Sequence, residues 1–179
     1  MTQRQVILFI AASLDGYIAK EDGDISWLDD FPAPLDVDNS YKEMFDTVDT
    51  VIMGRTTYDQ VTQELAPNDY PYIDKQTIVL TSKKERASAS TTFIHGNLVD
   101  YVRTLKQQAG ANIWLVGGNS VIQPLMEADL IDVYQLATLP IILGKGIPLF
   151  KPHNQQIKLV PKSVELINHI TYLTYTKKA

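Results

Sequence analysis

The sequence contains no cysteine among its 179 residues. Disulfide bonds, thiolate metal sites and a cysteine nucleophile are therefore excluded. Histidine is also scarce, and the spacing of His95, His153 and His169 matches none of the close patterns that bind zinc. We therefore expect no metal site in this protein.

Positive charge is in short supply as well, because 16 lysines and arginines face 21 aspartates and glutamates, which gives a formal net charge of -5 at pH 7. This balance disfavours nucleic acid as a partner, although a local basic pocket for a phosphorylated small molecule is compatible with it. The N-terminal apolar run is too short to cross a bilayer, and it lacks a basic segment followed by a cleavage site. We expect a cytoplasmic protein that binds a small molecule and no membrane.

The sequence also lacks internal repeats, low-complexity tracts and linkers. With 45% hydrophobic and 21% charged residues, a chain of this length can bury a sizeable core. We therefore expect one domain over residues 1–179.

Up to Asp129, short apolar runs alternate with amphipathic segments, which is typical of a parallel sheet covered by helices. Strands are expected at 5–12, 50–53, 77–80, 92–94 and 113–116, and helices at 40–46, 56–63, 98–108 and 120–127. After Asp129 the expected strands follow one another without helices, at 133–139, 158–168 and 171–176, the last two as a hairpin. The pattern predicts an α/β fold with a mixed, mostly parallel sheet and antiparallel C-terminal strands.

The segment IWLVGGNSVI, residues 113–122, runs from an apolar strand through Gly117 and Gly118 into a helix start. Glycine is conformationally costly, so two in succession require a reason. One alternative is a tight strand-to-helix turn, and the other is the close approach of an anion to the backbone at the positive end of a helix. Neither the G-x-G-x-x-G nor the G-x-x-x-x-G-K-[ST] fingerprint is present to decide between them.

Two further strand ends carry polar groups. Gly54 is followed by Arg55, which places a cation at the helix start, and by Thr56, which we expect to be the N-cap. Another strand ends in Thr81 and Ser82. If these strands are neighbours, their carboxyl ends form one anion site at the edge where open α/β sheets bind ligands, whereas each turn alone is equally compatible with a purely architectural role.

Several segments together resemble a known family. They are SLDGYIA at 13–19, VIMGRTTY at 51–58, VLTS at 79–82, WLVGGNSVIQPLM at 114–126 and LIDVYQLATLPIILGKGIPLF at 130–150. In this order they resemble the dihydrofolate reductase superfamily, and within it the reductases similar to the C-terminal domain of the bacterial riboflavin-biosynthesis deaminase-reductase. The resemblance implies a three-layer dihydrofolate-reductase-like fold, an NADPH-dependent oxidoreductase activity and a homodimer.

The resemblance also implies that NADPH lies across the strand ends. Gly117 and Gly118 are expected beneath the pyrophosphate, and in the family this pair is joined by a cis peptide bond. Arg55 favours NADPH over NADH, because a guanidinium binds a 2'-phosphate in a bidentate way. The other residues expected around the phosphates and at the following helix start are Gly54, Thr56, Thr57, Thr81, Ser82, Val116, Asn119, Ser120 and Val121.

At the nicotinamide end, the resemblance implies a mobile loop from Ser13 to Trp27 over the cofactor ring. Ala11 and Ile18 are expected to contact the nicotinamide and Trp27 to lie near the substrate, although an aromatic residue can equally pack in the core. Asp38 occupies the place of the carboxylate that orients the substrate in folate reductases. A helix N-cap is the alternative role for Asp38.

These expectations describe an NADPH-dependent reductase that transfers a hydride to a small heterocyclic or carbonyl-like substrate, without flavin or metal. Its substrate would resemble that of 5-amino-6-(5-phosphoribosylamino)uracil reductase or of dihydrofolate reductase. The alternative is an NADPH-binding sensor or regulatory protein without turnover. Apolar residues of the C-terminal region favour a homodimer, namely Val133, Leu136, Ile141, Ile142, Ile157, Leu159, Leu166, Ile170, Leu173 and Tyr175.

Overall fold

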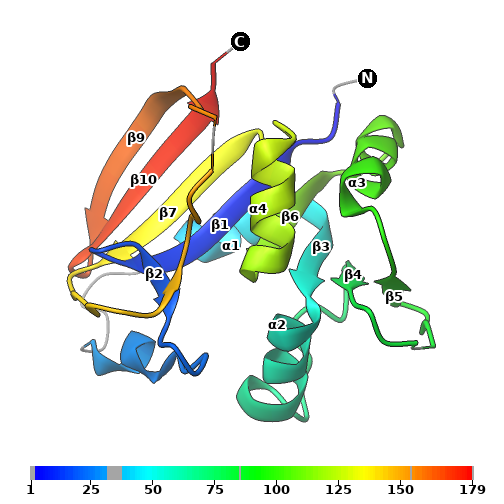
Figure 1. The fold of residues 1–179 in the computed structure, drawn as a ribbon, viewed down its shortest axis with the longest axis horizontal. Helices are drawn as coiled ribbons and strands as arrows, with labels where there is room; N and C mark the ends of the chain where they lie inside the picture. Colours follow the sequence, from blue (N-terminus) through cyan, green and yellow to red (C-terminus); the bar gives the residue numbers. More distant parts are fainter. Residues whose placement is uncertain (1–2, 32–37, 85, 154, 179) are drawn as a thin grey trace.

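The computed structural model describes residues 3–31, 38–84, 86–153 and 155–178. Its central feature is an eight-stranded sheet with the order β5-β4-β3-β6-β1-β7-β10-β9 (Figure 1). The strands from β5 to β7 are parallel, and β10 and β9 continue the sheet in antiparallel pairing. Their bounds are β1 Val6–Ser13, β3 Val48–Gly54, β4 Gln76–Leu80, β5 Thr91–Ile94, β6 Asn112–Gly117, β7 Val133–Leu139, β9 Leu159–Ile167 and β10 Ile170–Lys177.

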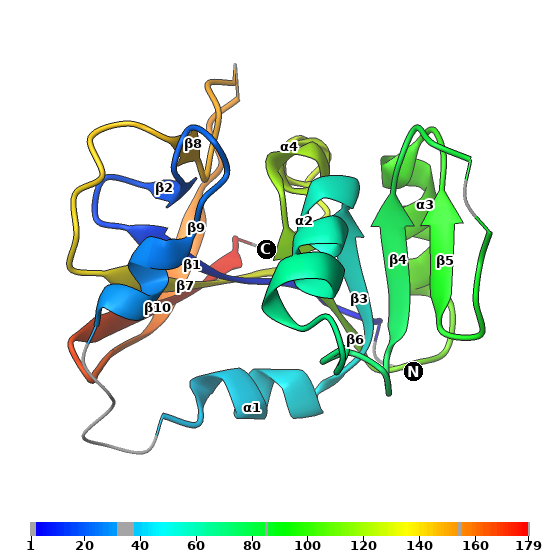
Figure 2. The ribbon, with the colours of Figure 1, turned by 90° about the horizontal axis from the view of Figure 1, so that it is seen from below.

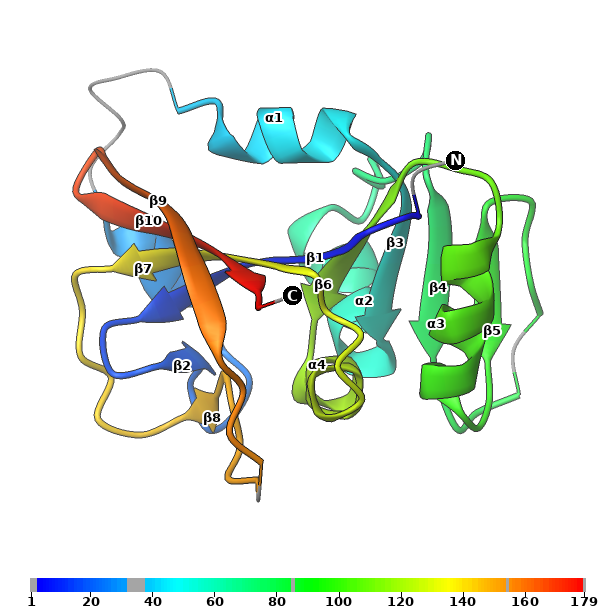
Figure 3. The same cartoon turned by 90° about the horizontal axis from the view of Figure 1, so that it is seen from above.

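Helices cover both faces of this sheet. The helix α1 (Ser40–Asp46) lies on one face, and α3 (Leu98–Gln107) and α4 (Asn119–Glu127) lie on the opposite face (Figures 2 and 3). The helix α2 (Arg55–Gln60) runs on into a π-helical turn, Val61–Leu65, whose Val61 shares a core cluster with Met44 of α1. None of the described helices is long and apolar enough to cross a membrane.

The strand β1 shows why continuous apolar runs form the centre of the sheet. Leu8 is fully buried in the cluster that α3 and α4 cover, whereas its neighbour Ile7 is buried in the cluster beneath α1. Because successive side chains point to opposite faces, a strand covered on both sides must be apolar at every position. Each fully buried aliphatic side chain contributes roughly 1.5 to 3 kcal/mol to stability.

The structure confirms the α/β fold expected from the sequence, including the antiparallel C-terminal strands and the hairpin at Asn168-His169. The expectation that Thr56 caps the second helix was wrong. The extended conformation of Gly54, with φ -77° and ψ 161°, makes this glycine the N-cap, so Thr56 lies inside the first helical turn. The two-stranded sheet of β2 (Tyr17–Ala19) and β8 (Ile147–Pro148) was missed, because both strands are too short to show a periodic pattern.

The order of the strands places a crevice at the carboxyl ends of β1, β3 and β6. After β1 the chain passes through α1 to β3, beyond β6, whereas after β6 it passes through α4 to β7, on the far side of β1. These two connections leave in opposite directions over opposite faces of the sheet. Open α/β sheets bind their ligands at such a point.

Candidate active site

The two glycine turns of the sequence meet in the structure. Because β3 and β6 are neighbours, Met53 pairs with Gly117, and both strands end at the same edge of the sheet. A Cβ atom on Gly54 would lie 2.5 Å from the hydroxyl oxygen of Ser120, and one on Gly118 would lie 3.3 Å from that of Thr57. Only glycine permits this close approach between the start of α2 and the start of α4.

The backbone at Gly117 and Gly118 explains why both residues are glycine. Their φ angles are +144° and +59°, values that side chains other than glycine rarely adopt. The peptide bond between them is trans, since the described residues contain no cis peptide bond, so the expected cis bond was wrong. The sharp turn into α4 is instead made by the two positive φ angles, and the Gly118 carbonyl accepts hydrogen bonds from the backbone of Val121 and Ile122.

A cleft of about 530 Å³ opens at this edge of the sheet. It brings together most of the residues expected to bind the cofactor, from both glycine turns, β1 and β2. These are Ala11, Ile18, Gly54, Thr56, Thr57, Val116, Gly117, Gly118, Asn119 and Ser120.

Four residues expected at the cofactor do not line the cleft. Arg55 lies at the start of α2, where its Nε donates a 2.7 Å hydrogen bond to Asp59, and its side chain is 24% exposed. Val121 is fully buried in the core beneath α4. Thr81 is buried at the end of β4 and accepts a hydrogen bond from the backbone of Lys83, and Ser82 is exposed beside it.

Trp27 also stands apart from the cleft. It lies in a 3-10 helix, Ser26–Asp30, and is only 1% exposed. Its indole Nε1 is buried without a hydrogen-bond partner in the described part of the chain. The structure thus places Trp27 in the interior, as in the core-packing alternative.

The loop from Ser13 to Trp27 forms one wall of the cleft. Its short strand β2 pairs with β8, and its residues Ile18, Gly23 and Ile25 line the cavity. Across the opening, the Gln60 side chain of α2 donates a 3.4 Å hydrogen bond to the Gly23 carbonyl. The loop therefore lies where closure would exclude water from the cavity.

The cleft also contains residues that sequence reasoning missed. Gln60 and Val61 follow Thr56 and Thr57 by four residues on α2 and its π-helical extension, so helical spacing was the signal that could have found them. Phe9 could have been found by strand alternation from Ala11. Trp114 could likewise have been found by alternation from Val116. Ala19, Gly23 and Ile25 belong to the loop that was expected over the cofactor ring, and Leu28 directly follows it. The lining residues with no such signal are Ile10, Leu65, Tyr72 and Ile147.

The lining of the cleft is mostly apolar, and among its described residues none is a carboxylate, lysine, arginine or histidine. Tyr72 is 8% exposed, and burial raises the pKa of its hydroxyl, with smaller contributions from Tyr41 and Tyr70. The hydroxyl is therefore neutral and cannot serve as a base near neutral pH. Such a cavity suits a ligand that brings its own reactive group, which the protein positions and shields.

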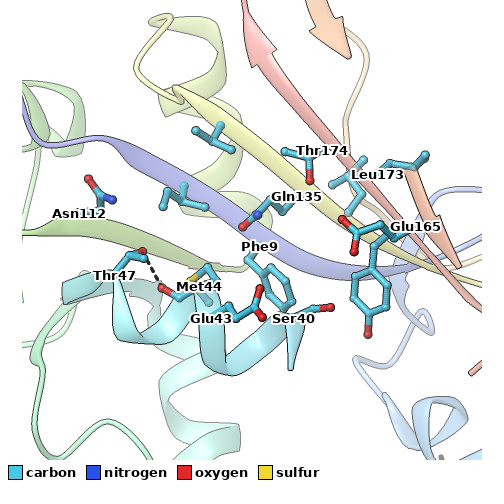
Figure 4. Close-up of a pocket in the computed structure, with 14 residues that line it drawn as sticks. Phe9, Ser40, Glu43, Met44, Thr47, Asn112, Gln135, Glu165, Leu173 and Thr174 are labelled. Carbon is cyan, nitrogen blue, oxygen red and sulfur yellow. Dashed lines mark hydrogen bonds between the residues drawn. The ribbon is translucent and has the colours of Figure 1, made fainter. Parts of the chain in front are cut away.

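A second cavity, of about 290 Å³, lies between α1 and the adjoining face of the sheet. Figure 4 shows Glu43 of α1 close to Phe9 of β1, with Gln135 on the neighbouring strand β7. Phe9 lines both cavities. The second cavity is open to solvent, since Glu43 and Glu165 on its rim are both exposed.

Asp38 lies at the N-terminal end of α1, beside this second cavity. One carboxylate oxygen accepts a 2.9 Å hydrogen bond from the backbone of Ser40, and the other accepts a short one from the hydroxyl of Tyr172 in β10. Burial acts to raise the pKa of Asp38, but these hydrogen bonds outweigh it and hold the pKa below its ordinary value. Asp38 is therefore ionised at neutral pH, and it joins α1 to the antiparallel part of the sheet.

We expect Tyr172→Phe to lower the free energy of unfolding at pH 7 by about 1 to 2 kcal/mol, because a hydrogen bond to an ionised group is lost. A carboxyl group with a depressed pKa stabilises the fold above its unfolded pKa and loses this contribution as the pH falls through its folded pKa. The deficit of the variant should therefore shrink in acid. Chemical unfolding across this pH range measures it.

Tyr175→Phe is the matched control, because the hydroxyl of this β10 tyrosine makes no hydrogen bond to a described residue. It should change stability little and equally at every pH. A loss in Tyr172→Phe that does not vary with pH would contradict the link to Asp38 ionisation.

Known proteins of similar sequence cover almost the whole chain. Residues 4–172 match the family described as the RibD C-terminal domain. The Bacillus subtilis (strain 168) protein YwjB is 40% identical over 98% of this chain and 99% of its own length, and YyaP of the same strain is 32% identical over 89% of this chain and 87% of its own. Both relatives are described as uncharacterized proteins.

Solved structures agree with these sequence matches. A Shewanella sp. PV-4 protein assigned to riboflavin biosynthesis superposes with a TM-score of 0.85 and 34% identity, covering 98% of this chain and 99% of its own. The dihydrofolate reductase of Enterococcus faecalis, solved with NADP(H), has a TM-score of 0.63 at 20% identity over 99% of this chain and 98% of its own. The Thermotoga maritima deaminase/reductase matches with a TM-score of 0.70 at 20% identity, over 98% of this chain and 57% of its own. The chain therefore belongs to the RibD C-terminal domain family and has the dihydrofolate-reductase-like fold.

Proposed function

We propose that this protein is an NADPH-dependent reductase that transfers a hydride to a small heterocyclic or carbonyl-like substrate. The observation that carries the proposal is the meeting of the two glycine turns, after β3 and β6, at the mouth of one apolar cleft. The glycines let a pyrophosphate come close to the backbone, and the N-terminus of α4 is suited to its negative charge. The apolar walls of the cleft suit a nicotinamide ring.

The cofactor supplies the hydride when bound. The protein holds the phosphates at Gly117 and Gly118, places Ala11 and Ile18 at the nicotinamide end, and excludes water with the loop that carries β2. In the overall reaction, the hydride adds to the carbon of a C=N or C=O bond of the substrate and a proton adds to its nitrogen or oxygen. Since the described lining residues include no group that is acidic near neutral pH, we assign this proton to solvent.

Asp38 keeps two proposed roles. As an ionised hydrogen-bond acceptor it can orient a substrate in the manner of the folate-reductase carboxylate, or it can serve the N-terminus of α1 alone. Its absence from the lining of the larger cleft favours the second role.

The test combines binding with turnover. Calorimetric titration should show NADPH binding, and NADPH absorbance should fall when a panel of pyrimidines, pterins and small carbonyl compounds is supplied. The panel includes 5-amino-6-(5-phosphoribosylamino)uracil and dihydrofolate. With NADPH deuterated at the transferred position, the deuterium should appear on carbon in the product. Absence of NADPH binding would overturn the proposal.

A second candidate function is an NADPH-binding sensor or regulatory protein without turnover. The lack of a carboxylate, lysine or histidine among the described cleft residues favours it, because a binding site needs no proton donor. Tight NADPH binding without oxidation on any member of the panel would support the sensor.

We also propose a homodimer through the outer end of the sheet. The strand β9 is an edge strand, and Val164 and Leu166 on one of its faces are 69% and 74% exposed. Unpaired edges with exposed apolar side chains are commonly covered by a partner, and a second copy is the commonest one.

Light scattering at micromolar concentration should give twice the 20.1 kDa mass of one chain. Leu166→Lys should shift this mass toward that of a monomer, because it places a charge on the proposed interface. Ile73→Lys is the control, since Ile73 is 64% exposed but lies outside the C-terminal strands. A wild-type mass near 20.1 kDa at every concentration would refute the dimer.

A further inference from the structure

Asn119 lies where the second glycine turn, the helix α4 and the larger cleft meet. It is the first residue of α4, it follows Gly118 directly, and it lines the larger cleft. It is nevertheless only 9% exposed. A polar side chain so deeply buried normally has all of its hydrogen-bonding atoms satisfied.

The orientation of the Asn119 amide is determined by its neighbour. The Nδ2 group donates a short hydrogen bond to the backbone carbonyl of Pro148 in β8. A carbonyl oxygen can only accept, so the amide nitrogen must face Pro148 and the position of Oδ1 follows. The alternative orientation would place two acceptors against each other.

The other atom, Asn119 Oδ1, is buried without a hydrogen-bond partner in the described structure. Such an acceptor is costly in a protein interior unless a donor reaches it. Asn119 itself lines the cleft, so a molecule bound there is the candidate source of the missing donor. The surrounding elements then indicate which part of the ligand lies there.

Asn119 stands between two parts of the proposed site. On one side are Gly117 and Gly118, proposed to lie beneath the pyrophosphate. On the other is β8, whose partner strand β2 carries Ile18, at the proposed nicotinamide end. In a nicotinamide dinucleotide, the group between the pyrophosphate and the nicotinamide ring is a ribose, and its hydroxyls are hydrogen-bond donors.

We propose that Asn119 Oδ1 accepts a hydrogen bond from a hydroxyl of this ribose, which makes Asn119 a specificity residue for the cofactor. The inference rests on the proposed NADPH site. The Nδ2 bond to Pro148 holds the amide in place before the ligand arrives, so the acceptor is preorganised.

Three nucleotides distinguish a contact of Asn119 with the nicotinamide-side ribose from a contact with any other part of the cofactor. NADP+ contains both the nicotinamide and the ribose attached to it. 2'-Phospho-ADP-ribose contains this second ribose without the nicotinamide, and 2',5'-ADP contains only the adenosine ribose. Calorimetric dissociation constants are measured for each nucleotide with the wild type and with Asn119→Ala. We expect Asn119→Ala to weaken NADP+ and 2'-phospho-ADP-ribose by roughly fivefold to tenfold, as for loss of one buried hydrogen bond, and to leave 2',5'-ADP unchanged.

The matched control is Gln123→Ala. Gln123 lies one turn further along α4, and its Oε1 accepts a 3.2 Å hydrogen bond from the backbone of Lys151, after β8. Gln123→Ala removes a hydrogen bond between α4 and the segment after β8, much as Asn119→Ala removes one between α4 and β8, but it takes no acceptor from the cleft. The affinities for all three nucleotides should therefore match those of the wild type. Asn119→Leu, which preserves the branched shape of the side chain, is the second variant if the alanine protein has a lowered melting temperature.

Each other outcome overturns the inference. An equal loss for all three nucleotides would show that Asn119 only supports the start of α4, and a loss confined to NADP+ would assign Oδ1 to the nicotinamide carboxamide. Unchanged affinities in Asn119→Ala would show that Oδ1 contacts no ligand. If the wild type binds none of the three nucleotides, the proposed function itself fails, which distinguishes that failure from the loss of this contact.

Discussion

Replacing Gly118 by alanine should weaken NADPH binding by roughly thirtyfold to a hundredfold or more, the equivalent of about 2 to 3 kcal/mol. With φ +59° and ψ 149°, Gly118 occupies a backbone region that is almost closed to other residues, where strain costs about 1 to 3 kcal/mol. An added methyl group would also lie 3.3 Å from Thr57 Oγ1, in the space between the two glycine turns. Calorimetric titration with NADPH and chemical unfolding measure the two effects.

Gly96→Ala is the control for backbone strain. Gly96 has φ +95°, and an added Cβ would meet no atom within 4 Å. It lies between β5 and α3, outside the lining of the cleft. This variant should lose stability yet retain wild-type NADPH affinity. If Gly118→Ala retained both affinity and melting temperature, the glycine pair would be only a convenient turn.

Arg55→Ala should change cofactor preference more than any other single substitution. If the guanidinium binds the 2'-phosphate, its loss should weaken NADPH binding by roughly 1.5 to 3 kcal/mol, about tenfold to a hundredfold, and leave NADH binding nearly unchanged. Arg55 forms an ion pair with Asp59 one turn along α2, and it follows Gly54 at the end of β3. The ratio of the dissociation constants for NADPH and NADH measures the effect.

Arg103→Ala tests whether the loss of any helical ion pair has the same result. Arg103 forms a 3.0 Å pair with Asp100 on α3, and both side chains are more than half exposed. Such pairs contribute little, so neither affinity should change. Equal losses of NADPH and NADH affinity in Arg55→Ala would show that Arg55 does not bind the 2'-phosphate.

Much of the fold could be predicted because its signals are local. The helix α1 begins and ends at the predicted residues, Ser40 and Asp46, and the apolar runs of β1 and β6 mark strands buried on both faces. The spacing of apolar residues along a helix or strand depends only on which of its faces is buried, so it can be read from residues that are close in the sequence. The strands β2 and β8 escaped this reasoning, because a strand of two or three residues has no period to read.

The candidate site was predictable in part for the same reason. The glycines at 54, 117 and 118 mark turns whose backbone other residues cannot adopt, and this requirement is visible in the sequence. Their shared edge depended on β3 and β6 being neighbours, which the sequence left open and the sheet order established. The sequence could not decide whether Trp27 lies near the substrate or packs in the core, because both positions suit an aromatic residue. The structure places its side chain in the interior.

The sequence by itself thus determined the longer helices and strands, their order along the chain and the glycine turns, because propensity, periodicity and turn geometry act between residues close in the chain. Only the tertiary structure decided which distant groups meet. It joined Asp38 to Tyr172 and brought Ser120 against Gly54. It also left Asn119 Oδ1, whose amide nitrogen bonds Pro148, buried without a partner among the residues that the structure describes. Such contacts depend on how strands far apart in sequence are ordered in one sheet, and no local pattern encodes that order.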